Sequence, residues 1–463
     1  MRSLAGLVLL LLGGSLFALR LEPLPQASAW PAAGSSLDRE GLIDLALVLS
    51  GAPDSSLAAY KAQLSRWSAE FRSQVRPEWD DAKKAEALLQ SLHTHLTAYS
   101  TYQTRLDVLL DQGTFNCVSS AVAYMILGRD AGLDVQAVAT IDHAFALVRL
   151  PGGRAVDVET TTRYGFDPGT KTEFTNSFGH TGFVYVPPGN YAQRKTIGDR
   201  QLLGLLVQNR LVDFWTSGRP EDGVGPAIDR WTIEGTPEAS KTLVDSFVNY
   251  ASWLNDRRDY LGGLALIDPM VRWTGPGADA KKLVATFVNN QVAVLLDRQD
   301  WATAETLTAT WLDRGFLTAA QAADERALIA DNRLAKAARS LPAADAAQQI
   351  EAAFAQGLVP PGRRAELLAF AYGQAAQRVA NEKGNRAAWE YLAGLPAAHQ
   401  SLPGVAKARE VFSYNWGVDV HNRFAQLWNS GKTAEARQLL ADALKEMPNN
   451  TLLKRDWDAS QTN

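Results

Sequence analysis

The stretch "GTFNCVSSAVAYMILGRDAGL", residues 113–133, decides how the first half of the chain is interpreted, and it holds the only cysteine, Cys117. Asn116 is a residue type that caps helix N-termini, so the pattern predicts a helix that begins at Cys117. Backbone N–H groups and the helix dipole at such a position favour a thiolate. A lone cysteine is otherwise most often a small buried residue, so the neighbouring sequence has to separate the two interpretations.

Three short strands are predicted after this helix. "VQAVATI" (135–141) and "HAFALVRL" (143–150) are typical of strands, "PGG" turns the chain, and "RAVDVETT" (154–161) returns. Before the helix, residues 38–110 carry apolar residues at three- and four-residue spacing, which indicates helices. The pattern therefore predicts an α+β domain in which one helix packs on a small antiparallel sheet.

The length of the hairpin loop decides which acidic residue approaches His143, the first residue of the second strand. If "PGG" is a three-residue loop, Leu147 faces Asp157 on the returning strand. Because side chains alternate along a strand, Asp157 and Glu159 then both share the face of His143, and Glu159 is the nearer of the two. A two-residue loop would turn both carboxylates away.

A thiol at a helix start, an imidazole that takes its proton and a carboxylate that orients the imidazole form a nucleophilic triad. Residues 113–162 carry these groups in that order, and they resemble the transglutaminase-like cysteine peptidase superfamily. The resemblance implies a papain-like α+β fold and assigns catalytic roles to Cys117 and His143. We favour Glu159 as the acid, whereas Asp157 stays open because aspartate is more usual in this role in the family.

The resemblance implies thiol acyl chemistry on an amide of a protein or peptide substrate. Cys117 would attack the carbonyl after His143 takes its proton, and water or an amine would then release the thioester, so hydrolysis and acyl transfer both stay open. This chemistry needs no cofactor, and a single cysteine excludes a multi-cysteine zinc site. The alternative function is a non-catalytic scaffold that keeps an inactive domain of this type.

The second half of the chain contains an internal repeat. "LVDSFVN" at 243–249 recurs as "LVATFVN" at 283–289, and "LNDRRDY" at 254–260 recurs as "LLDRQDW" at 295–301. A period near 40 residues with helical patterning indicates an α-solenoid, and the spacing near the C-terminus resembles a tetratricopeptide repeat. After a transglutaminase-like domain at 36–195, we therefore expect stacked helix pairs without a sheet over 200–463, forming a platform for a substrate or a protein partner.

The N-terminus predicts export. An apolar run over residues 4–19 follows Arg2; it is short for a membrane span, which needs about 20 residues, and suits the core of a signal peptide. Residues 1–29 are interpreted as a signal peptide or an uncleaved anchor, with a mature N-terminus between 20 and 35 in the periplasm, envelope or extracellular space. Any membrane contact is expected through this segment alone, and a net charge of −4 gives no basic face for nucleic acid.

Overall fold

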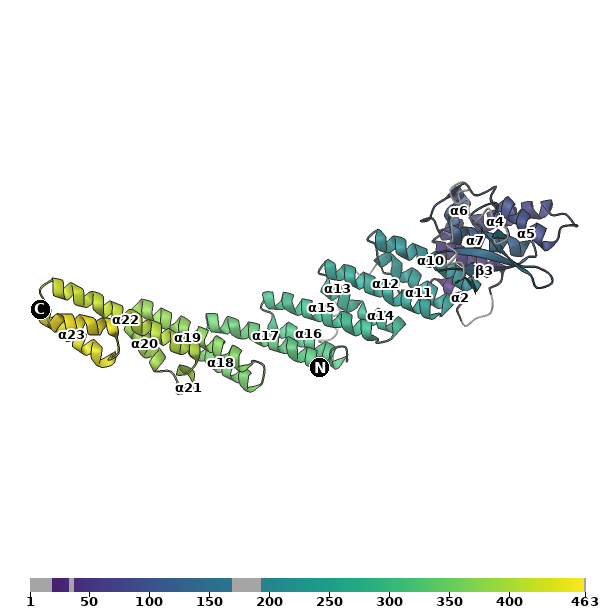
Figure 1. The fold of residues 1–463 in the computed structure, drawn as a ribbon. Coiled ribbons are helices and arrows are strands. Elements are labelled where there is room, and N and C mark those ends of the chain that lie inside the picture. The colour runs from purple at the N-terminus through teal and green to yellow at the C-terminus, as the bar shows by residue number, and fades with distance from the viewer. Residues whose placement is uncertain (1–18, 33–36, 169–192, 462–463) are drawn as a thin grey trace. The chain divides into compact units, whose positions relative to one another are not determined.

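The computed structural model describes residues 19–32, 37–168 and 193–461. The chain divides into two compact units, residues 1–287 and 288–463. The first unit combines a small antiparallel sheet with helices, and the second is built from helices (Figure 1). An α+β region followed by a helical C-terminal region is the coarse fold class that the sequence predicted.

Helix α7 (Cys117–Asp130) is the central element of the first unit. Its residues from Cys117 to Gly128 are all buried, so this helix has no polar face and is enclosed by neighbours on every side. It packs against β3 (Asp134–Ala139) and β4 (Ala144–Arg149). The helices that precede it and contact it are α3 (Arg39–Ser50), α4 (Leu57–Gln74), α5 (Asp81–Leu92) and α6 (Leu106–Gln112), with a short 3₁₀ turn at Asp54–Ser56.

The sheet has the strand order β5-β4-β3-β6 and is antiparallel throughout, with β5 at Ala155–Val158 and β6 at Lys195–Ile197. Leu147 pairs with Asp157, as the three-residue loop predicted. The N–H of Leu150 donates to the Arg154 carbonyl at 2.7 Å and closes that loop. Gly152 and Gly153 both have a φ of 84°, a conformation that glycine adopts without strain, which explains why "PGG" fixes this register.

A second, two-stranded ladder lies directly before α7. Strands β1 (Ala98–Tyr99) and β2 (Thr114–Phe115) are parallel, and Tyr99 pairs with Phe115. This ladder is not predictable from the sequence, because parallel strands two residues long carry no local pattern. Its consequence is that residues near 100 lie beside the start of α7.

All regular structure described from Asp199 onward is helical, which confirms the expected absence of a sheet there. The helices are α10 (Asp199–Thr216), α11 (Glu221–Glu234), α12 (Pro237–Asp256), α13 (Tyr260–Ala265), α14 (Ile267–Thr274), α15 (Ala278–Asp297), α16 (Trp301–Asp313), α17 (Ala319–Ser340), α18 (Ala343–Ala355), α19 (Pro361–Lys383), α20 (Asn385–Ala393), α21 (Ala397–Gln400), α22 (Pro403–Asn429), α23 (Thr433–Glu446) and α24 (Thr451–Gln461).

Long helices begin at residues 199, 237, 278, 319, 361 and 403, about 40 residues apart. Each is followed by one or more shorter helices. The two "FVN" stretches lie in α12 and α15, where Phe247 and Phe287 are both buried, so the sequence repeat marks equivalent positions. The period is longer than the roughly 34 residues of a tetratricopeptide repeat.

The change from mixed to all-helical structure falls between β6 and α10, close to the predicted boundary at 195–200. The compact units nevertheless divide elsewhere, at Phe287. The reason is that α10 packs against α3, α7 and β3, so the first helices of the repeat region are part of the unit that holds the sheet.

The residues that directly follow the predicted leader core are part of the first unit. Residues 1–18 lie outside the described residues, whereas α2 (Pro25–Ala29) packs against α3 and α11. Arg20 forms an ion pair with the buried Asp229 at 2.5 Å, and the indole of Trp273 donates to the Leu21 carbonyl at 2.9 Å. In the part of the chain that the structure describes, no helix combines the length and the apolar character that a membrane crossing requires.

Candidate active site

Cys117 is the first residue of α7, as the sequence predicted. The side-chain oxygen of Asn116 accepts from the N–H groups of Val118 and Ser119, both at 3.0 Å, and the Ser119 hydroxyl accepts from the Asn116 N–H at 3.0 Å. This capping box uses the neighbouring amides and fixes where the helix begins. Cys117 is the first helical residue, a position whose N–H has no acceptor within the helix, so this N–H is available to a group bound at the sulfur.

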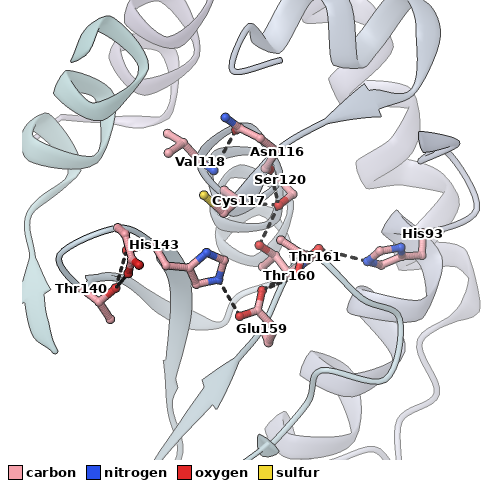
Figure 2. Close-up of polar contacts among 11 residues, drawn as sticks. His93, Asn116, Cys117, Val118, Ser120, Thr140, His143, Glu159, Thr160 and Thr161 are labelled. Atoms are coloured by element: carbon pink, nitrogen blue, oxygen red, sulfur yellow. Dashed lines mark hydrogen bonds and ion pairs between the residues drawn. The ribbon is translucent and has the colours of Figure 1, made fainter. Parts of the chain in front are cut away.

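His143 follows the tight turn between β3 and β4, which is closed by the Thr140 N–H donating to the His143 carbonyl at 2.8 Å. Its ring is buried and lies between Cys117 and the carboxylate of Glu159 (Figure 2). The distance from His143 Nε2 to Glu159 Oε2 is 2.7 Å. The other ring nitrogen, Nδ1, is buried and has no hydrogen-bond partner within the described parts of the chain.

This arrangement fixes the tautomer of the imidazole. A carboxylate only accepts hydrogen bonds, so His143 Nε2 carries a proton and donates it to Glu159. In the neutral ring the lone pair is then on Nδ1, the nitrogen that can exchange a proton with Cys117. The unpartnered buried atom is thus the one that a thiol-activating base would use.

Glu159 directly follows β5 and is held through both carboxylate oxygens. Oε2 bonds His143, while Oε1 accepts from the Thr161 hydroxyl at 2.7 Å and from the Thr161 N–H at 3.0 Å. Three donors on one buried carboxylate restrict its rotation. The carboxylate therefore presents a fixed face to the imidazole.

The charges of the pair stabilise each other. Burial alone would lower the pKa of His143, but the Glu159 carboxylate and the adjacent Cys117 sulfur outweigh it and raise that pKa to about 10. For Glu159, burial opposes ionisation, yet His143 and the Thr161 hydrogen bonds hold the pKa of the carboxyl below its usual range. The site consequently favours an imidazolium beside a carboxylate near neutral pH.

Asp157, the other acid that the sequence left open, lies elsewhere. It lies within β5, two residues before Glu159 and one same-face position farther from His143, and its carboxylate forms an ion pair with Arg194. The structure thus brings Cys117, His143 and Glu159 together and leaves Asp157 outside this group.

A second set of polar residues positions the loop that carries Glu159. The hydroxyls of Ser120 and Thr160 are 2.8 Å apart, and His93 Nε2 lies 3.0 Å from the Thr160 carbonyl oxygen. Burial lowers the pKa of His93, which favours a neutral ring that donates to this carbonyl. Sequence reasoning missed these partners, although the run Glu159-Thr160-Thr161 placed two hydroxyls next to the acid.

Gly165 closes the same loop, because its backbone lies closer to the Glu159 backbone than a larger residue would allow. The Glu159 N–H donates to the Gly165 carbonyl at 2.8 Å, and a Cβ at position 165 would come within 2.0 Å of the Glu159 carbonyl oxygen. Only glycine fits at this distance. The loop is therefore held at both ends close to the acid.

Tyr99 is a further neighbour of the site that sequence reasoning missed. Its ring lies edge-on to Phe115, with ring centroids 5.7 Å apart, and Phe115 is two residues before Cys117. Burial raises the pKa of Tyr99, and the charges of Cys117 and Glu159 raise it further. The phenol therefore remains protonated and can donate a hydrogen bond beside the thiol.

The described residues contain no group of three or more metal-binding side chains close enough to hold an ion. Profiles of known protein families give no match to the sequence, and a search of curated proteins finds no significant similarity. The chemistry of the site therefore rests on its own geometry.

Proposed function

We propose that this chain is a cysteine-dependent amide hydrolase or acyl transferase whose first unit is a domain of the transglutaminase-like cysteine peptidase type. The observation that carries the proposal is the placement of His143, whose Nε2 donates to Glu159 while its unpartnered Nδ1 lies towards Cys117. A buried cysteine kept only for packing requires neither a fixed imidazole tautomer nor a carboxylate held by three donors.

The proposed reaction begins with attack of the Cys117 thiolate on the amide carbonyl carbon. The new S–C bond moves the carbonyl π electrons onto oxygen, where the Cys117 N–H stabilises the negative charge. His143 Nδ1–H gives its proton to the amide nitrogen, the C–N bond breaks and the amine leaves. A thioester of Cys117 remains.

The second half of the proposed reaction regenerates the thiolate. Water, or a second amine, gives a proton to His143 Nδ1 and attacks the thioester carbonyl, and the S–C bond breaks. Water yields hydrolysis and an amine yields acyl transfer. Glu159 remains ionised throughout and stabilises the imidazolium whenever it forms.

The helical repeats and the N-terminal segment extend the proposal. We assign the stacked helix pairs, here called tetratricopeptide-like, a role in presenting a protein substrate or partner. The short apolar run after Arg2 supports an exported protein that acts outside the cytoplasm. The competing function is a scaffold that retains the site without turnover.

Alkylation of Cys117 by iodoacetamide, followed by mass spectrometry between pH 6 and 8, separates the two functions. We expect His143→Ala to slow alkylation about tenfold or more, because the thiolate loses its imidazolium partner. Glu159→Gln should slow it less, and Asp157→Asn, the matched control two residues earlier in the chain, by less than about twofold. Equal alkylation rates in all folded variants would mean that Cys117 is an inert buried residue and the domain a scaffold.

A further inference from the structure

The backbone N–H of Cys117 belongs to the same peptide group as the carbonyl of Asn116. This peptide bond is trans and planar, so the direction of the carbonyl fixes the direction of the N–H. The Asn116 carbonyl oxygen accepts from the Ser120 N–H at 3.0 Å and from the Ser120 hydroxyl at 2.8 Å. Two donors use both lone pairs of this oxygen, so the peptide group that presents the N–H at the sulfur is held in one orientation.

The Ser120 hydroxyl is also bonded to the loop that carries Glu159. Its oxygen lies 2.8 Å from the Thr160 hydroxyl, and both side chains are fully buried (Figure 2). Each hydroxyl has one proton to donate. Within the described residues, Ser120 is the acceptor that the structure gives the Thr160 hydroxyl, so Thr160 donates to Ser120 and Ser120 donates to the Asn116 carbonyl. The Cys117 carbonyl is farther from the Ser120 hydroxyl, at 3.3 Å.

Thr160 is also fixed through its backbone. His93 Nε2 lies 3.0 Å from the Thr160 carbonyl oxygen, and the next residue, Thr161, makes two hydrogen bonds to the Glu159 carboxylate. Thr160 therefore joins two parts of the site. Its hydroxyl reaches the first turn of α7, and its backbone lies within the loop that orients the imidazole.

The order of these hydrogen bonds has an electronic consequence. In a buried chain of hydrogen bonds, each donor polarises the group to which it donates and strengthens the next bond. The chain from Thr160 through Ser120 to the Asn116 carbonyl therefore withdraws electrons from the Cys117 N–H of the same peptide group. Serine hydroxyls often bond the carbonyl four residues earlier in a helix; the additional bond from Thr160 is what connects this one to the loop of Glu159.

We infer that Ser120 and Thr160 are positioning residues for the Cys117 N–H, which they align and polarise towards the carbonyl oxygen of a substrate. The inference rests on the proposed function, since it concerns the donor that stabilises the negative oxygen at the same site. It makes acylation of Cys117 depend on the loop of Glu159 in two ways, through the imidazole and through the chain of hydroxyls.

The test compares two reagents that react with the Cys117 sulfur of the full-length protein. p-Nitrophenyl acetate is attacked at its carbonyl carbon: the S–C bond forms, negative charge develops on the carbonyl oxygen, and the C–O bond breaks as p-nitrophenolate leaves. Iodoacetamide is attacked at its methylene carbon, where the S–C bond forms as iodide leaves and no oxyanion develops. The ratio of the acylation rate to the alkylation rate therefore reports how well the N–H stabilises an oxyanion. Cys117→Ala gives the background release of p-nitrophenolate.

We expect Ser120→Ala and Thr160→Val to lower this ratio about fivefold to tenfold, a part of the roughly 10²–10³ in rate that a whole oxyanion donor contributes. Thr160→Ser keeps the hydroxyl and should restore the ratio. Thr162→Val is the matched control, because it removes another buried hydroxyl of the same loop, one that accepts from the Tyr164 N–H, and it should keep the ratio. Glu159→Gln should slow both reactions together, since it changes the supply of thiolate.

Two results would overturn the inference and leave the proposed function intact. One is an unchanged ratio in folded Ser120→Ala and Thr160→Val, with both rates still dependent on His143. The other is an equal fall of the ratio in Thr162→Val, which would show a general loosening of the loop. Rates of acylation and alkylation that do not depend on His143 would instead refute the proposed function.

Discussion

At the scale of single residues, the protonation of His143 decides what the site can do. In the proposed reaction, the imidazolium supplies the proton that the leaving amine requires, and the neutral ring supplies the base for the second step. Glu159 stabilises the first form by charge and fixes the tautomer of the second through Nε2. Both properties depend on the Glu159 carboxylate, which is buried and accepts three hydrogen bonds. Changes of pH and substitutions at this residue should therefore have the clearest effects on stability and reactivity.

The His143–Glu159 ion pair predicts that the free energy of unfolding lost on Glu159→Gln depends on pH. The pKa of His143 in the folded protein is raised from 6.5 to about 10, so its contribution to stability is fully present below pH 6.5 and is lost as the pH rises through about 10. The pKa of Glu159 is lowered, so its contribution is present above its usual value of 4.5 and is lost under acid conditions. Removing one partner of a buried pair costs about 3 kcal/mol or more.

Between pH 5 and 6.5 the free energy of unfolding should therefore differ most between the natural protein and Glu159→Gln, and the difference should shrink towards pH 10. Urea unfolding at pH 6 and pH 10 measures both values. A difference that stays constant over this range would mean that His143 is not charged in the folded protein.

At the scale of elements, the sequence predicted those parts of the site that depend on short-range structure, namely a helix start and a hairpin loop. Asn116 identified the start of α7, and two consecutive glycines identified the loop that sets the register of Asp157 and, one step further, of Glu159. Tyr99 and His93 could not be found in this way, because the parallel β1–β2 pairing and the end of α5 bring them to the site over long sequence separations. The same limit applies to α10, whose packing on α7 moves the boundary of the compact unit.

The capping box of α7 gives a prediction that links helix stability to the site. Asn116→Ala removes the acceptor for two backbone N–H groups and should cost about 0.5–2 kcal/mol of stability. Because the first turn would then fray at Cys117, iodoacetamide alkylation should lose its dependence on His143. Thr318→Ala, which breaks the equivalent capping box of α17, is the control and should affect stability alone. If both variants alkylate like the natural protein, the cap serves only the helix.

At the scale of the whole molecule, the first unit includes residues 20–24, which belong to the segment that the sequence predicts as a signal peptide or an anchor. The sequence alone allowed a mature N-terminus anywhere between residues 20 and 35. The backbone N–H of Leu24 donates to Asp229 at 2.8 Å, and Arg20 supplies the opposite charge to the same buried carboxylate. Burial raises the pKa of Asp229, and Arg20 opposes that rise. We therefore expect any processing to leave residues from Arg20 onward in place.

A comparison of proteins that begin at residue 19 and at residue 30 tests this expectation. The shorter protein leaves Asp229 buried without its guanidinium and without the Leu24 N–H, a loss of about 1–3 kcal/mol for an unsatisfied buried group. Urea unfolding should show that difference, and Asp229→Asn in both backgrounds should reduce it, because a neutral amide needs no counter-charge. Equal stability of the two lengths would show that residues 19–29 are dispensable, and cleavage after Ala29 would then be compatible with the folded unit.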